Sequence, residues 1–151
     1  MLKNGNNLEY RSVKIETNKT VVRQFIEAIN QQDFVRLDAL VSSEVIRHGA
    51  PPDKYLQGLT KLKEFLRGEL AIFPDAYETI HFLIAEGEMV AAYLGFHGTQ
   101  TGQLGSFPPS GKTLETDFMC IFRLENSKIL EIWALWDRLD ALARLGHLAI
   151  N

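Results

Sequence analysis

The order of two hydrophobic patterns along the chain restricts the possible fold more than any other feature of this sequence. In the first half, apolar residues recur every three or four positions in three segments: 20–29, 34–41 and 59–70. In the second half, apolar residues concentrate in four strand-like segments separated by turn residues: 77–85, 89–97, 112–124 and 128–136. Helices that precede strands are typical of an α+β domain, whereas α/β folds alternate the two. We therefore predict three helices packed on one curved, mostly antiparallel sheet.

Two shorter segments complete the expected domain. Residues 44–49 are partly β-branched and lead into Pro51 and Pro52, which predicts a short strand that enters a loop; residues 137–145 predict a last short helix. Residues 1–16 contain few apolar side chains, so we expect a loose N-terminal arm. The remaining residues, 17–151, have the length of a single domain.

Charge and composition exclude several classes of partner. The 16 Lys and Arg residues against 19 Asp and Glu residues give a net charge of −3, and no basic run is present that could follow a nucleic-acid backbone. No window approaches 18 consecutive apolar residues, which argues against a membrane span, and the N-terminus lacks a signal-peptide pattern. The single cysteine, Cys120, cannot form an intrachain disulfide, so we predict a cytoplasmic protein.

The C-terminal part of the sequence resembles a known family. The run from Glu131 to Asp137 (EIWALWD), followed by Leu142 to Gly146 (LARLG), is similar to the signature of SnoaL-like polyketide (ester) cyclases. The Gly-rich segments 98–102 and 108–111 fit the same pattern. The resemblance implies the cone-shaped α+β fold shared with nuclear transport factor 2, scytalone dehydratase and ketosteroid isomerase, in which sheet and helices enclose an apolar pocket. Gln100 stands where family members often have His, so the substrate is not implied.

Asp137 is the candidate catalytic residue. It ends an apolar strand, where a low-dielectric environment would favour an acid that exchanges a proton near neutral pH. The alternation of side chains along a strand places Trp133, Leu135 and Asp137 on one face, which predicts an indole wall beside the carboxylate. The alternative is structural, because Asp at a strand-to-helix junction commonly caps the helix that follows. Both interpretations are left open by the sequence.

Several further residues are candidates for the same pocket. His48 precedes a Gly and Pro-rich loop and is a second catalytic candidate, while Asp117 is a weaker acidic one that could instead form a plain ion pair. Tyr93 and Gln100 could supply neutral hydrogen-bond donors. The expected walls come from the last strand and from two helices: Trp133, Leu135, Phe25 and Phe65.

Metal and nucleotide sites are not expected. No two histidines have the spacing of metal ligands within one helix or strand, and no Glu-x-x-His pattern occurs. Residues 105–113 (GSFPPSGKT) end like a phosphate-binding loop, but the glycine spacing is wrong and a strand follows where a helix is required. We therefore predict no metal and no cofactor.

These observations lead to a functional hypothesis with two alternatives. The first is a cofactor-independent cyclase that abstracts a proton alpha to a carbonyl, as in an intramolecular aldol closure, and binds a small apolar carbonyl compound. The second is a non-catalytic binding or assembly module with the same pocket, and the third is isomerase or dehydratase chemistry. A fold-level analogy with ketosteroid isomerase supports an Asp base in an apolar site.

The second half also predicts a homodimer. Segment 112–124 is apolar on both faces, because Met119 and Ile121 alternate with Phe118, Cys120 and Phe122. A sheet covered by helices on one side would then expose an apolar patch on the other, which monomers seldom tolerate. Pairing two such faces would bury it. The alternative is that the arm, residues 1–16, covers the patch within one chain.

Overall fold

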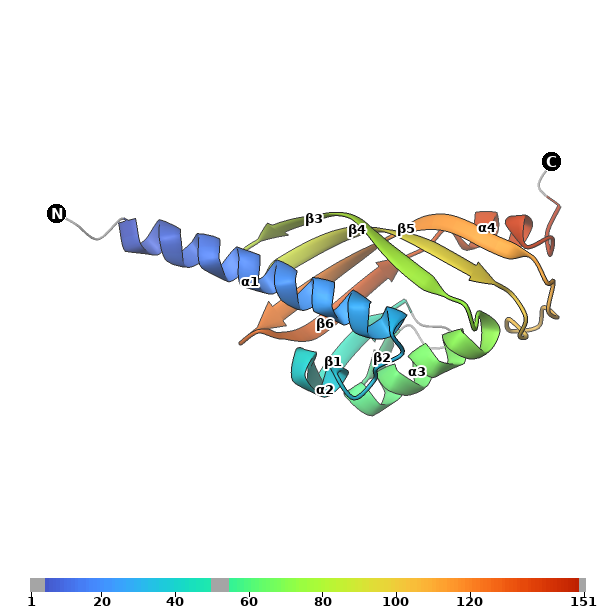
Figure 1. The fold of residues 1–151 in the computed structure, drawn as a ribbon, viewed down its shortest axis with the longest axis horizontal. Coiled ribbons are helices and arrows are strands. Elements are labelled where there is room, and N and C mark those ends of the chain that lie inside the picture. Colours follow the sequence, from blue (N-terminus) through green and yellow to red (C-terminus); the bar gives the residue numbers. More distant parts are fainter. Residues whose placement is uncertain (1–4, 50–54, 150–151) are drawn as a thin grey trace.

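The computed structural model describes residues 5–49 and 55–149, and it has the predicted α+β class (Figure 1). Its elements in chain order are α1 (Gly5–Asn30), α2 (Leu37–Leu40), β1 (Val41–His48), β2 (Tyr55–Gln57), α3 (Leu59–Ile72), β3 (Tyr77–Glu86), β4 (Met89–Thr99), β5 (Thr113–Glu125), β6 (Lys128–Leu135) and α4 (Arg138–Arg144). The alternating segments and the third helical segment begin and end close to the residues predicted from periodicity. The short strand β2 was not predicted.

One open, curved sheet holds the fold together. Its six strands have the order β2-β1-β6-β5-β4-β3, so β2 and β3 are the edges. All neighbours are antiparallel except β1 and β6, the second and third strands from the β2 edge, which pair in parallel. The sheet is therefore mixed, and it is not closed into a barrel. Helices α1, α2 and α3 lie together on one side of it, and α4 lies at the end of β5 (Figure 1).

The first helix differs from its prediction at the N-terminal end. It begins at Gly5, so residues 5–16 are helical and continuous with α1 and do not form a separate loose segment. This half of α1 projects beyond the sheet (Figure 1), and Leu8, Tyr10 and Val13 are exposed on it. None of the described helices, α1 included, is long and apolar enough to cross a membrane.

Alternation along β5 separates an inner from an outer sheet face. Leu114, Phe118, Cys120, Phe122 and Leu124 are buried on the inner face, under the helices. The alternate residues of β5 lie on the outer face of the sheet, opposite the helices. On this face Met119 is 51% and Ile121 42% exposed. The predicted division of this strand into two apolar faces is confirmed. The main core lies between the inner face and the buried stripe of α1, which includes Val22, Phe25 and Ile26.

Candidate functional site

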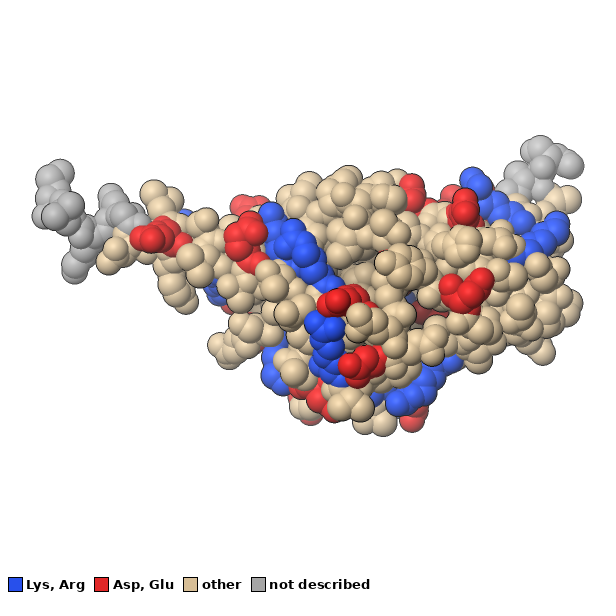
Figure 2. Space-filling view, in the orientation of Figure 1, with Lys and Arg blue, Asp and Glu red and all other residues tan. Residues whose placement is uncertain are grey.

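A small cavity lies between the inner sheet face, α1 and α3. Its volume is about 40 Å³, and its walls are mostly aromatic and aliphatic. The lining includes the predicted Phe25 and Phe65, together with Leu62, Phe118, Phe122 and Trp136. In the space-filling view the surface is hollowed between α1 and α3, and acidic atoms are visible inside the hollow (Figure 2). The cavity therefore has mostly apolar walls, but charged side chains also reach it.

Three charged side chains line this cavity, each from a different element: Arg47 from β1, Glu69 from α3 and Glu78 from β3. They were not predicted, although the sequence carries a signal for them. Arg47 alternates with the buried Val45, and Glu69 falls three residues after Leu66 in the apolar stripe of α3. Charged residues at positions that periodicity assigns to the core indicate function more often than packing.

The end of α1 positions Glu78. The side chain of Asn30, the last residue of α1, accepts a hydrogen bond from the Glu78 backbone N–H at 2.8 Å and donates one to the Glu78 carbonyl at 2.8 Å. An edge strand leaves such backbone groups unpaired on one side, and here an amide side chain satisfies both. The carboxyl group of Glu78 is thereby held at a fixed place on the cavity wall.

Burial changes the acidity of the groups around the cavity. The pKa of Glu78 is raised to about 8, mainly by desolvation and additionally by the negative charge of Glu69, with Arg47 acting in the opposite direction. Desolvation also raises the pKa of Glu69, which Arg47 partly offsets. The Cys120 thiol, whose pKa burial raises to about 12, stays neutral. Near neutral pH the cavity thus holds one guanidinium, a protonated Glu78 and Glu69, whose pKa is also raised.

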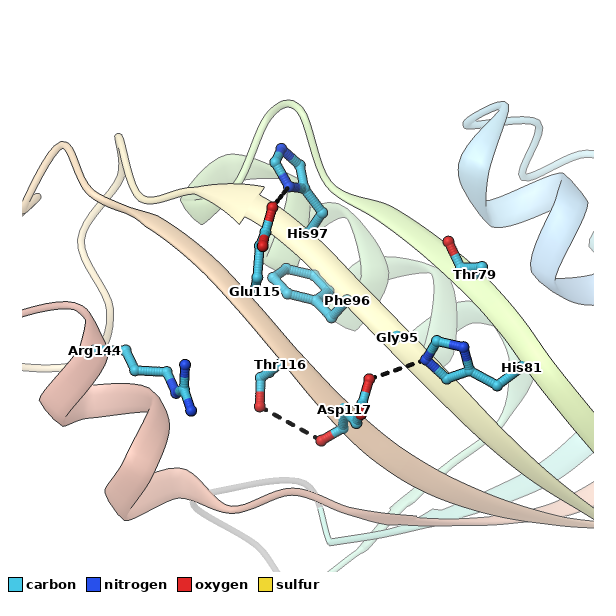
Figure 3. A pocket seen from close by; sticks show the side chains of 9 residues that line it. All are labelled: Thr79, His81, Gly95, Phe96, His97, Glu115, Thr116, Asp117 and Arg144. Carbon is cyan, nitrogen blue, oxygen red and sulfur yellow. Dashed lines mark hydrogen bonds and ion pairs between the residues drawn. The ribbon is translucent and has the colours of Figure 1, made fainter.

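A larger but shallow groove, of about 390 Å³, lies on the outer sheet face (Figure 3). His81 lies at a break in the β3–β4 register, and its Nε2 lies 2.9 Å from Asp117 Oδ1 on β5. The intervening Gly95 makes this reach possible, because a Cβ there would lie 2.9 Å from His81 Nε2. Tyr93 donates a 2.6 Å hydrogen bond to Asp117 Oδ2. Arg144 of α4 faces the pair across the groove (Figure 3).

The chemistry of this outer groove is less suited to proton transfer. The hydrogen bonds from Tyr93 and then His81 lower the pKa of Asp117, so its carboxylate keeps its charge through the neutral range. All three side chains are in contact with solvent, where a fixed charge is strongly screened. The smaller inner cavity, with a carboxyl that is protonated at neutral pH, is the better candidate active site.

The remaining predicted residues on β1 and β6 also lie on the outer face. His48 stacks on Trp133, with ring centroids 5.0 Å apart, and its Nε2 lies 2.8 Å from Glu131 Oε1. The other oxygen of Glu131 accepts a 3.0 Å hydrogen bond from Arg123 Nε. The bond to His48, followed by Arg123, lowers the pKa of Glu131. Leu135 is 68% exposed on the same face.

The structure therefore places the residues of the predicted pocket on two opposite faces of the sheet. Phe25 and Phe65 line the inner cavity, but Trp133 and Leu135 lie on the opposite face of the sheet, because the inward residues of this strand and its extension are Ile132, Ala134 and Trp136. Tyr93, Asp117 and His48 lie on the outer face as well. Periodicity gave the two faces of β6 correctly but did not identify which of them the helices cover.

The side chains of Gln100 and Asp137 form hydrogen bonds that stabilise a loop and a helix, respectively. The fully buried Gln100 amide donates to the Gly102 and Pro108 carbonyls at 3.1 Å each, and its oxygen accepts from the Ser110 N–H at 3.3 Å. It thereby holds the loop between β4 and β5 together. Asp137 Oδ1 accepts a 2.9 Å hydrogen bond from the Asp140 N–H, which is the capping arrangement for α4, and Asp137 is not among the cavity-lining residues.

The side chains present offer no ready metal site. Within residues 5–49 and 55–149, no three His, Cys, Asp or Glu side chains come together in a way that could hold a metal ion.

Comparison with known proteins adds family information to this geometry. The model of the SnoaL-like polyketide cyclase family matches residues 19–145. TsrD from Streptomyces laurentii is 26% identical, with a TM-score of 0.78 over 88% of this chain and 97% of that one. A SnoaL-like polyketide cyclase from Agrobacterium tumefaciens str. C58 is 23% identical, with a TM-score of 0.72 over 84% and 95% of the two chains. A comparison with curated proteins gave no match. The family match, which extends from the middle of α1 to the end of α4, establishes that this chain belongs to the SnoaL-like polyketide cyclase family.

Proposed function

We propose that this protein is a cofactor-independent, cyclase-like enzyme that abstracts a proton alpha to a carbonyl within the inner cavity. The observation that carries the proposal is the pairing of two carboxyl groups, Glu69 and Glu78, on the wall of an aromatic cavity that also holds Arg47. Two acids whose environments separate their proton affinities can act as a base and an acid in one reaction. The family match supports cyclase chemistry.

The roles follow from the charges. Glu69, whose negative charge is one of the causes that raise the pKa of Glu78, is the base in this proposal: it takes the proton from the carbon beside a carbonyl, which becomes an enolate. The enolate attacks a second carbonyl of the same molecule, and Glu78 gives its proton to the new alkoxide. Each step moves a negative charge between oxygens within the cavity that Arg47 also lines, so the net charge of the cavity does not change. A cation held in a low-dielectric site stabilises such anionic states.

Substrate entry requires local movement. A ring-forming substrate is larger than the cavity volume of about 40 Å³, so side chains of α3 that line it, such as Phe65, must move outward on binding. The site assigned here differs from one built around Asp137. The capping bond to Asp140 favours the structural role for that carboxylate.

Deuterium exchange tests the elementary step. Heptane-2,6-dione in D₂O should exchange its alpha protons faster in the presence of the protein and close to the hydroxycyclohexanone, as followed by NMR; loss of water from this aldol then gives the cyclohexenone that is followed by ultraviolet absorbance. Glu69→Gln should lower both the exchange rate and the ring-closure rate at least about 100-fold, whereas Glu78→Gln should lower ring closure by a similar factor and leave exchange unchanged. Glu115→Gln, on the exposed outer face, is the matched control and should retain both rates. An exchange rate equal to that of the buffer would overturn the enzyme proposal and favour a non-catalytic binding module.

We also infer that the chain forms a homodimer through the outer sheet face. Five large apolar side chains of β3, β5 and β6 are exposed there: Phe82, Ile84, Met119, Ile121 and Leu135. Residues 5–16 do not supply an intramolecular cover, since they belong to α1, whose N-terminal half projects beyond the sheet (Figure 1). A two-fold axis would bring two copies of this apolar face together.

A further inference from the structure

Arg47 has an unusual environment among the charged side chains. It is only 8% exposed, and its guanidinium carbon lies 4.1 Å from the centroid of the Phe65 ring. Its Nη1 is the single buried side-chain nitrogen or oxygen within the described residues that has no hydrogen-bond partner. A buried, charged donor without an acceptor destabilises a folded protein, so its retention calls for an acceptor that arrives from outside.

The two carboxyl groups of the cavity do not supply that acceptor. In the part of the chain that the structure describes, no ion pair of 4.0 Å or less joins Arg47 to Glu69 or Glu78. All three side chains nevertheless line the same cavity. The guanidinium and the two carboxyl groups therefore line one cavity, and neither carboxyl group forms an ion pair with the guanidinium.

We propose that Nη1 of Arg47 anchors a carboxylate of the ligand, so that the cavity selects small carboxylic acids in their ionised form over the corresponding esters and amides. The proposal rests on the proposed function in placing the substrate in this cavity, and it adds the substrate class. The guanidinium fork matches a carboxylate in charge and geometry. The aromatic walls, which include Phe25 and Phe118, suit the apolar remainder of such an acid.

Glu78 supplies the second donor. In its protonated form its hydroxyl can donate to the other oxygen of the ligand carboxylate, as neutral carboxyl groups in apolar sites do. A phosphate dianion fits less well, because it would bring two negative charges to a site with one cation and two acids. The chemistry of the site therefore favours a monoanion with two oxygens in one plane.

Binding should depend on pH through the groups that face the ligand. These are Glu69 from α3, Glu78 from β3, Cys120 from β5 and Arg47 itself, with Arg138 acting on Arg47 at longer range. Above pH of about 8 Glu78 loses its proton, so the site loses a donor and gains a repelling charge. Acid binding should then weaken by up to about tenfold for each further pH unit, whereas the thiol of Cys120, with a pKa of about 12, remains neutral.

Trp136 provides a reporter. It lines the cavity and stacks on Phe118 with ring centroids 4.0 Å apart, while the only other tryptophan, Trp133, lies on the outer face. The Trp133→Phe protein should therefore report cavity occupancy through Trp136 fluorescence. Acetate and acetamide, and benzoate and benzamide, form two pairs of probes of similar size that differ in charge.

At pH 6.5 each acid should bind at least about tenfold more tightly than its amide. Arg47→Met should abolish this preference, with near-ultraviolet circular dichroism showing a native signal; Arg123→Met, on the outer face, is the matched control and should retain the preference. Equal affinities for acid and amide, a preference that survives in Arg47→Met, or no saturable signal would overturn the proposal. If the protein binds acids but does not catalyse alpha-proton exchange, this inference is supported and the proposed function is wrong. If it catalyses exchange of neutral ketones but shows no preference for acids, the proposed function is supported and this inference is wrong.

Discussion

The side chain of Asn30, at the end of α1, forms hydrogen bonds with both the backbone N–H and the backbone carbonyl of Glu78, on the edge strand β3. The contact joins residues that are 48 positions apart in sequence, and it holds the backbone of the residue whose carboxyl pKa is raised to about 8. The placement of the candidate acid therefore depends on the docking of α1.

Replacing Asn30 should separate these elements locally. Asn30→Ala leaves two partly buried backbone groups of Glu78 without partners, so we expect the free energy of unfolding to fall by about 1–3 kcal/mol. Gln31→Ala, at the next residue along, which is exposed, is the control and should change the free energy of unfolding by less than about 0.5 kcal/mol. Urea titration followed by circular dichroism measures both. Equal effects of the two substitutions would contradict the clamp.

Stability should depend on pH through Glu78. The folded protein holds this proton up to a pH of about 8, against an ordinary pKa of 4.5 in the unfolded chain. Between these values the folded state binds more protons, so its stability falls as pH rises. Glu78→Gln should remove this slope and be more stable than wild type at pH 8.5 by on the order of 5 kcal/mol, with little difference at pH 4. A difference that does not change with pH would show that the carboxyl ionises freely.

Asp137 can be tested by two substitutions that separate capping from catalysis. Asp137→Ala removes the acceptor for the Asp140 N–H and should cost about 1 kcal/mol, whereas Asp137→Asn should retain most of the stability. Because the carboxylate lies outside the cavity lining, we expect Asp137→Asn to retain alpha-proton exchange as well. Complete loss of exchange in a fully stable Asn variant would restore Asp137 as the base.

Periodicity predicted most of this fold, because each strand and the main helices bury one regular stripe. It placed β5 and its two faces correctly and gave the segment of α3. It did not predict the first half of α1, because the mostly exposed residues there do not form a regular apolar stripe. It also did not predict the three-residue strand β2. The site was harder. Arg47, Glu69 and Glu78 come from three elements, and their meeting in one cavity depends on which sheet face the helices cover.

Two glycines offer a matched pair of stability tests. A Cβ at Gly102, in the loop that docks on the end of α3, would clash with the Ala71 carbonyl oxygen, so Gly102→Ala should cost more than about 2 kcal/mol. Gly68 lies within α3 and has no atom within 4 Å of an added Cβ, so Gly68→Ala should stabilise by about 0.5–1 kcal/mol. Thermal unfolding of both variants gives the comparison, and the same sign for both would refute it.

The assembly prediction concerns the outer face. Sedimentation at micromolar concentration should give twice the 17.1 kDa mass of the chain. Ile121→Lys, at a side chain 42% exposed on this face, should shift the protein to monomer, while Val35→Lys, at a residue 78% exposed outside it, should not. A wild-type mass near that of one chain would exclude the dimer.

The parallel pairing of β1 with β6 sets a condition on how the chain can be made. His48 and Glu131, which meet across this pair, are 83 positions apart. During synthesis the N-terminal helices and β1 leave the ribosome long before β6 exists, so β1 stays without its parallel partner until residues 128–135 have emerged. Contacts of such separation also slow folding. We expect chains truncated before residue 128 to aggregate.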